Sequence, residues 1–172
     1  VHVQSNTRLP SFTLPSVTSV GEYFEIDSNG SLTELSVPQL TSVSGYIYLY
    51  RNALISMVEA FPLLETVGTR LQVNDNDELT TLDGTFPALT DVGDYIEIQG
   101  NDRLTSLGDG FSALTNLVGY LRIESNPGLL SLAGGFPVLT DLGSLTIENN
   151  DALVSIENGL SALTNLTNSL TI

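Results

Sequence analysis

Residues 101–126 read NDRLTSLGDGFSALTNLVGYLRIESN, and they contain one full repeat of this chain. The same order of residue types recurs along the 172 residues: an asparagine, a Leu-x-x-Leu step, a bulky apolar residue, a Leu-Thr-x-Val segment, a glycine and a short alternating stretch. The asparagines recur every 23 to 25 residues, at Asn6, Asn29, Asn52, Asn76, Asn101, Asn126 and Asn150. A fixed period of this length is typical of a solenoid.

The alternating stretches predict the strands. Residues 95–98 read Tyr-Ile-Glu-Ile and residues 120–123 read Tyr-Leu-Arg-Ile, an alternation with period two that is typical of half-buried strands. One coil cannot bury its own apolar side, whereas stacked coils pair their strands about 4.8 Å apart. We therefore expect a single all-β domain over residues 1–172. Its predicted architecture is a right-handed parallel β-solenoid of seven 23–25-residue coils, with little or no α-helix.

The asparagines and the glycines of the repeat have structural explanations. We expect the seven asparagines to form an internal ladder in which each side-chain amide satisfies backbone groups of its own and neighbouring coils. The glycines suit a corner that needs either a positive φ or a close approach of two backbones. The glycine positions are Gly21, Gly45, Gly68, Gly93, Gly119 and Gly143.

The two ends of the sequence lie in strand pattern, at Val1 and at Ile172. Solenoids need polar caps that cover their open edges, and no cap is recognisable at either end. We expect the chain to be a slice of a longer repeat protein. Self-association, with coils stacked end to end or laterally between copies, is the second interpretation.

Composition excludes several classes of function. There are 20 acidic and 5 basic residues, and the net charge of −15 repels the phosphates of nucleic acids and anionic membranes. No apolar run approaches the roughly 20 residues of a membrane helix, so we expect no membrane insertion in this segment. Cysteine is absent and His2 is the one histidine, which excludes thiol catalysis and thiolate or multi-histidine metal sites. We expect no cofactor and no metal site, although weak calcium binding by the acidic residues around Asn76 stays open.

The repeat resembles that of the leucine-rich repeat superfamily, and more narrowly the receptor L-domain type of repeat. Residues 101–126 match its pattern almost throughout, from the asparagine through Leu-Thr-Ser-Leu and Leu-Thr-x-Leu to Tyr-Leu-Arg-Ile. The resemblance covers essentially the whole chain. It implies an extracellular, non-enzymatic module at the cell surface that serves adhesion, recognition or structural assembly.

The outward positions of the predicted strands collect all six tyrosines on one face of one sheet. Tyrosine supplies a large contact area with a polar tip, which suits a surface that binds a protein or a glycan, and arginines can stack on the rings or pair with ligand groups. Tyrosine is also a good strand former that pairs across strands, so a purely structural ladder is an equally open interpretation. The candidate binding residues are Tyr23, Tyr46, Tyr48, Tyr50, Arg70, Tyr95, Tyr120 and Arg122.

Two other classes of function have some support in the sequence. Regular threonines on a flat solenoid face are able to order water, which makes an ice-binding protein an alternative. The threonines concerned are Thr18, Thr41, Thr90, Thr115, Thr140 and Thr164. A polysaccharide-acting β-helix enzyme would need two carboxylates about 5–9 Å apart in a cleft. Glu124 and Glu148 are predicted to be neighbours, but coils of nearly constant length leave no long loop to wall a cleft, so we expect no enzyme.

Two Asn-x-Ser/Thr sequons occur, at Asn29 and at Asn165. Asn29 belongs to the predicted internal ladder and should be turned inward, where it cannot be glycosylated. Asn165 is therefore the candidate glycosylation site.

Overall fold

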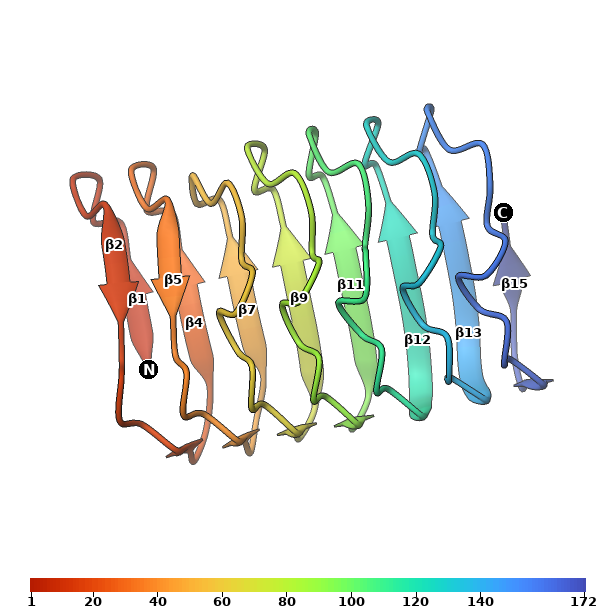
Figure 1. Ribbon diagram of the computed structural model, residues 1–172, viewed down its shortest axis with the longest axis horizontal. Coiled ribbons are helices and arrows are strands. Elements are labelled where there is room, and N and C mark those ends of the chain that lie inside the picture. The colour runs from red at the N-terminus through yellow and green to blue at the C-terminus, as the bar shows by residue number, and fades with distance from the viewer.

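The computed structural model describes all 172 residues and contains strands but no helix, so nothing in it has the length of a membrane-spanning helix. Each coil contributes one strand to a parallel main sheet. The chain rises along a strand at the back of Figure 1, returns through the front and advances by one coil, which makes the solenoid right-handed. The main strands are β1 (His2–Gln4), β4 (Phe24–Asp27), β7 (Ile47–Tyr50), β9 (Arg70–Asn74), β11 (Tyr95–Gln99), β12 (Asn116–Glu124), β13 (Asp141–Glu148) and β15 (Leu170–Thr171).

A second line of parallel strands, which the sequence did not lead us to expect, is formed by the Leu-Thr-x-Val segments. These strands are two residues long, too short to show an alternating pattern. They belong to the same 13-stranded sheet because β12 and β13 run continuously through both lines. The short strands are β3 (Ser19–Val20), β6 (Ser42–Val43), β8 (Thr66–Val67), β10 (Asp91–Val92) and β14 (Asn165–Leu166).

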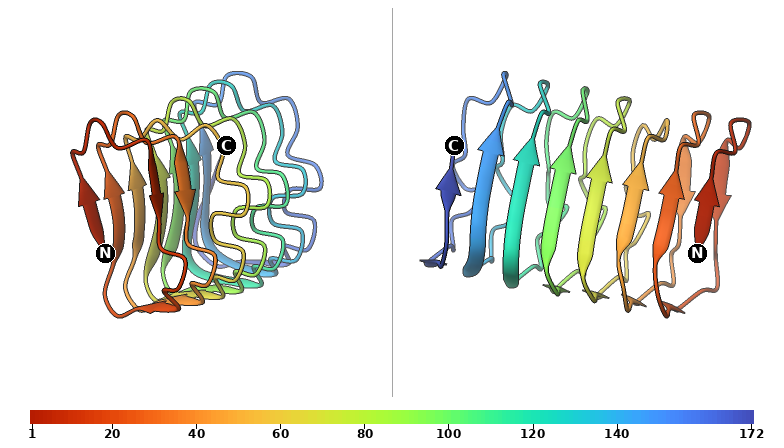
Figure 2. Two further views of the ribbon diagram at one scale, coloured as in Figure 1. Left: turned by 60° about the vertical axis from the view of Figure 1, so that its left-hand side comes forward. Right: turned by 180° about the vertical axis from the view of Figure 1, so that it is seen from behind.

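The third side of the solenoid, which faces the viewer in Figure 1, is less regular. Strands β2 (Ser11–Thr13) and β5 (Glu34–Ser36) form a two-stranded parallel sheet there. Farther along, the same position of the coil makes only single bridges, from Thr81 through Ser106 and Ser131 to Ser155. The views in Figure 2 show that all coils have nearly the same outline and stack in one column.

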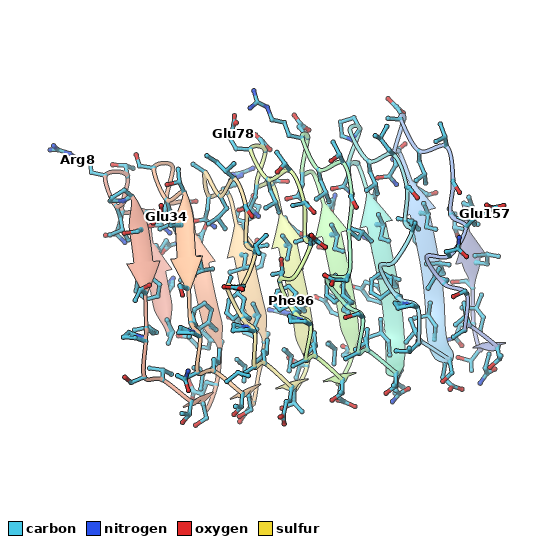
Figure 3. All side chains as sticks on the ribbon, viewed as in Figure 1. Arg8, Glu34, Glu78, Phe86 and Glu157 are labelled. Atoms are coloured by element: carbon cyan, nitrogen blue, oxygen red, sulfur yellow. The ribbon has the colours of Figure 1, made fainter.

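The interior is one continuous core of 39 buried apolar residues. A ladder of phenylalanine rings runs along it, with Phe61, Phe86, Phe111 and Phe136 stacked at centroid distances of 5.3, 5.5 and 4.9 Å. Figure 3 shows Phe86 inside the column, while charged side chains such as Glu78 and Glu157 point outward. The repeat therefore places an equivalent ring in each of these four coils, and stacking joins the coils.

The asparagines form the internal ladder that the repeat predicts. The backbone N–H of Asn76 donates to Oδ1 of Asn101 at 3.0 Å, and the N–H of Asn101 donates to Oδ1 of Asn126 at 3.1 Å. The Nδ2 group of Asn101 donates to the carbonyl oxygens of Val73 and Gln99. The side chain of Asn101 thus links its own coil to both neighbours, and its burial is possible because its amide group is fully hydrogen-bonded.

The corner with positive φ lies immediately before each asparagine. Serine, arginine, aspartate, glycine or asparagine occupies it, at Ser5, Ser28, Arg51, Asp75, Gly100, Ser125 and Asn149, with φ between 50° and 66°. None of the six glycines of the predicted corner has a positive φ, and close backbone approach explains five of them; at Gly21, in the first coil, an added Cβ would meet no atom within 4 Å. A Cβ added at Gly93 would overlap the backbone carbonyl oxygen of Gly68 in the preceding coil.

Candidate binding face

The register of the main sheet places the candidate binding residues on one face, which we call the tyrosine face. Tyr95 pairs with Arg70, and Glu97 pairs with Gln72 and Arg122. Tyr48 pairs with Glu25 and Gln72, and Tyr50 pairs with Asp27 and Asn74. The face is defined by Tyr23, Tyr46, Tyr48, Tyr50, Arg70, Tyr95, Tyr120 and Arg122.

The first line of outward side chains has an arginine between two pairs of stacked tyrosines. Tyr23 and Tyr46 stack with ring centroids 5.3 Å apart, and Tyr95 and Tyr120 stack at 4.3 Å. Arg70 lies between the pairs, and its guanidinium carbon is 4.4 Å from the centroid of the Tyr46 ring. Such aromatic and cation–π contacts hold the rings in fixed positions.

A third stacked pair lies along β7, where Tyr48 and Tyr50 have centroids 5.2 Å apart. The guanidinium of Arg51, an arginine that was not among the candidates, covers the Tyr50 ring at 4.7 Å. Arg51 also pairs with Asp75 at 3.3 Å. Its position directly after the strand and the proximity of acidic residues were visible in the sequence, but its left-handed corner conformation was not.

All six tyrosines are partly buried, and burial changes the acidity of three of them. Burial raises the pKa of Tyr48 to about 12 and also raises the pKa of Tyr120. Burial raises the pKa of Tyr46 as well, with a further contribution from the hydrogen bond that its hydroxyl donates to Oε2 of Glu25 at 2.9 Å. These three phenols are therefore neutral at physiological pH.

Two carboxylates on the face are buried and accept hydrogen bonds from neighbouring side chains. Glu97 is 8% exposed and accepts hydrogen bonds on Oε1 from Gln72 at 3.0 Å and from Asn74 at 2.5 Å. Its Oε2 lies 3.9 Å from an Nη of Arg122. Asp27, also 8% exposed, accepts from Gln4 and Ser28. We did not predict these networks, because the repeat shows which residues lie side by side but not which side-chain groups turn toward one another.

The tyrosine face is flat. None of the four surface depressions of the molecule is lined by any of the six tyrosines. In the three stacked pairs the rings cover one another's inner faces, so the surface offers ring edges, hydroxyl groups and guanidinium groups. Such a surface can form hydrogen bonds and edge contacts with another flat surface, but it does not enclose a small molecule.

Hydroxyl groups of the exposed threonines donate hydrogen bonds to backbone carbonyls of the preceding coil. Oγ1 of Thr90 donates to the backbone carbonyl of Glu65 at 3.2 Å, and Oγ1 of Thr140 donates to that of Thr115 at 3.3 Å. Thr105, in the Leu-Thr-Ser segment, donates in the same way to the carbonyl of Thr80. These hydroxyls tie each coil to the one before it, which gives the threonines a structural role.

The remaining candidate groups do not come together in a site. Glu124 and Glu148 are register partners, but no depression is lined by both of them, and Glu124 lies 3.8 Å from Nε of Arg122. No group of three or more histidine, aspartate or glutamate side chains is arranged to hold a metal ion. Asn29 is fully buried, whereas Asn165 is exposed and donates to Oδ1 of Asp141.

Comparisons with known proteins identify no relative. No protein-family model matches the chain, no curated protein is significantly similar to it, and no solved structure matches its fold significantly.

Proposed function

We propose that this chain is a non-enzymatic, extracellular recognition module, a leucine-rich repeat of the receptor L-domain type, that binds a partner protein through the tyrosine face. The observation that carries the proposal is the gathering of all six tyrosines and two of the five arginines on one flat, partly exposed face. Tyrosine and arginine are the residues most enriched at the centres of protein interfaces.

The packing of the face supports this use. Stacked rings and paired carboxylates fix the side chains before any partner arrives, so binding would immobilise few additional rotamers. Flatness favours a protein over a glycan or a small ligand. A sugar would stack on the open face of an aromatic ring or enter a groove, and here the inner ring faces are covered and the tyrosines line no depression.

The location outside the cell rests on the repeat pattern. The resemblance to receptor L-domain repeats favours the cell surface, and the acidic exterior agrees with a module that stays soluble without binding nucleic acids.

A binding screen with matched variants tests the proposal. The wild-type protein is screened against arrays of purified extracellular proteins and of glycans, and each hit is measured again with Tyr46→Ala, Tyr95→Ala and Glu34→Ala. Glu34 is exposed on β5, on another side of the solenoid, and serves as the control (Figure 3). Protein hits that lose at least ten-fold in affinity with both tyrosine variants, and not with Glu34→Ala, support the proposal. Hits confined to glycans, or unchanged affinity in the tyrosine variants, contradict it.

A further inference from the structure

Arg70 is the only partly buried arginine without a carboxylate nearby; the other unpaired arginine, Arg8, is exposed. Arg51 pairs with Asp75, Arg103 with Glu78, and Arg122 lies near Glu97 and Glu124. Arg70 makes no ion pair and donates no side-chain hydrogen bond, and its Nε is buried without a partner. In a chain with four acidic residues for every basic one, an unpaired and partly buried guanidinium is an exception that needs an explanation.

The neighbouring carboxylates are held away from Arg70 by other donors. Glu97, one strand along, accepts from Gln72 and Asn74 and faces Arg122. Glu25, two strands away on the other side, accepts from the hydroxyl of Tyr46 and lies 3.3 Å from Nε2 of His2. Both carboxylates are therefore engaged elsewhere, and the positive charge of Arg70 is left uncompensated.

The guanidinium is also held in place. It lies over the Tyr46 ring at 4.4 Å, while the register partner on its other side, Tyr95, has its ring stacked on Tyr120. Stacking fixes the plane of the guanidinium, and a fixed plane favours bidentate hydrogen bonding to a carboxylate. The cation also lies in the middle of the first line of tyrosines, where the contacts that contribute most to a protein interface are usually found.

We propose that Arg70 is an anchor for a carboxylate, and that the partner protein places an aspartate or glutamate side chain on it. This inference rests on the proposed function and adds the chemistry of the contact. A single acidic side chain would meet the one uncompensated cation of the face, whereas acidic groups elsewhere on the partner would be repelled by the carboxylates of this chain.

Nitrogen-15 NMR on the intact chain tests the anchor without a partner. The chain has five arginines and no lysine, so the spectrum contains five arginine Nε–Hε signals, which single Arg→Lys variants assign. The probe is N-acetylglutamate, and N-acetylglutamine at the same ionic strength is the uncharged control. Arg8, which is exposed and also has no carboxylate partner, is the internal reference (Figure 3).

We expect N-acetylglutamate to shift the Arg70 signal along a saturating curve, with a shift at least five-fold larger than that of Arg8 at the same concentration. N-acetylglutamine should move neither signal. Tyr46→Leu, which removes the ring beneath the guanidinium, should reduce the Arg70 response at least three-fold, whereas Glu34→Ala should not change it. Equal shifts of Arg70 and Arg8, or an equal response to the amide probe, would overturn the anchor.

Failure of the anchor is distinguishable from failure of the proposed function. If Arg70→Gln binds a partner protein as tightly as the wild type while Tyr46→Ala and Tyr95→Ala do not, the tyrosine face is the binding site and the anchor is wrong. A loss of at least ten-fold in affinity with Arg70→Gln, together with the NMR response above, supports the anchor.

Discussion

The asparagine ladder and the tyrosine face run along the same solenoid, one inside and one outside, and they differ in how regular they are. Seven asparagines occupy the same position of every coil, each bonded to the next. On the outside, the first line of the face changes from tyrosine to arginine, back to tyrosine, and then to Ser144 in β13.

The difference shows which constraints act on each position. An interior position must satisfy the coil before it and the coil after it, so a change in one coil affects both neighbours. A side chain at an outward position of the main sheet needs only to be compatible with a β-strand. Variation there is compatible with the fold, and the proposed recognition role would explain why the tyrosines cluster in the first five coils.

The largest effect is expected from the phenylalanine ladder. Phe111→Ala removes a fully buried ring that stacks on both Phe86 and Phe136, and we expect the free energy of unfolding to fall by about 3–5 kcal/mol. Urea unfolding followed by circular dichroism measures the change. A loss smaller than about 1 kcal/mol would mean that the stacked rings do not hold the coils together.

The asparagine ladder should come next. Asn101→Ala leaves the N–H of Asn76 and the carbonyl of Val73 buried without their partner. Each unsatisfied buried group costs about 1–3 kcal/mol, so we expect a total loss of about 3 kcal/mol in the same unfolding experiment. Asn165→Ala, at an exposed asparagine outside the ladder, is the control and should change stability by less than about 0.5 kcal/mol. Equal losses for the two variants would contradict the ladder's role.

Alkaline pH should weaken the tyrosine face. Because burial raises the pKa of Tyr48 from 10.0 to about 12, the unfolded chain releases this proton at a lower pH than the folded chain. The contribution is fully present below pH 10 and is lost as the pH rises through 12. Unfolding measured between pH 9 and pH 12 should show a steeper loss of stability in the wild type than in Tyr48→Phe. Identical slopes would show that the ring is not desolvated as described.

Removal of one ring from the face should cost less than either interior change. Tyr95→Ala breaks the stack with Tyr120, and we expect a loss of about 1 kcal/mol in unfolding free energy. The loss of unfolding free energy in Tyr95→Ala should be clearly smaller than that in Phe111→Ala. A similar loss in both variants would mean that the stacked tyrosines stabilise the solenoid as the phenylalanine ladder does.

The smallest effect concerns the corner before each asparagine. Ser125 has φ of 55°, a conformation that costs a non-glycine residue about 1–2 kcal/mol, whereas glycine adopts it freely. Ser125→Gly should raise the unfolding free energy by about 0.5 kcal/mol, because part of the gain is offset by the greater flexibility of glycine in the unfolded chain. A clear destabilisation would mean that Ser125 contributes through its side chain.

Much of this fold follows from the spacing of a few residue types. The asparagines gave the coil length, and Tyr-x-x-Ile stretches such as residues 95–98 gave both the strands and the outward positions. The spacing did not reveal the left-handed corner, because Ser28, Arg51 and Asp75 share no obvious residue type. It also gave no sign that Arg70 would remain unpaired while Arg122 lies near Glu97, since that depends on the conformations of the side chains and not on the register.

The most direct test is to measure stability and binding together in Tyr46→Ala/Tyr95→Ala. Urea unfolding gives the stability, and titration against a partner protein found in the screen gives the affinity. If the tyrosine face exists for recognition, the double variant keeps its fold, loses no more than about 2 kcal/mol of unfolding free energy and binds at least ten-fold more weakly. A double variant that unfolds, or one that binds as tightly as the wild type, would contradict the account.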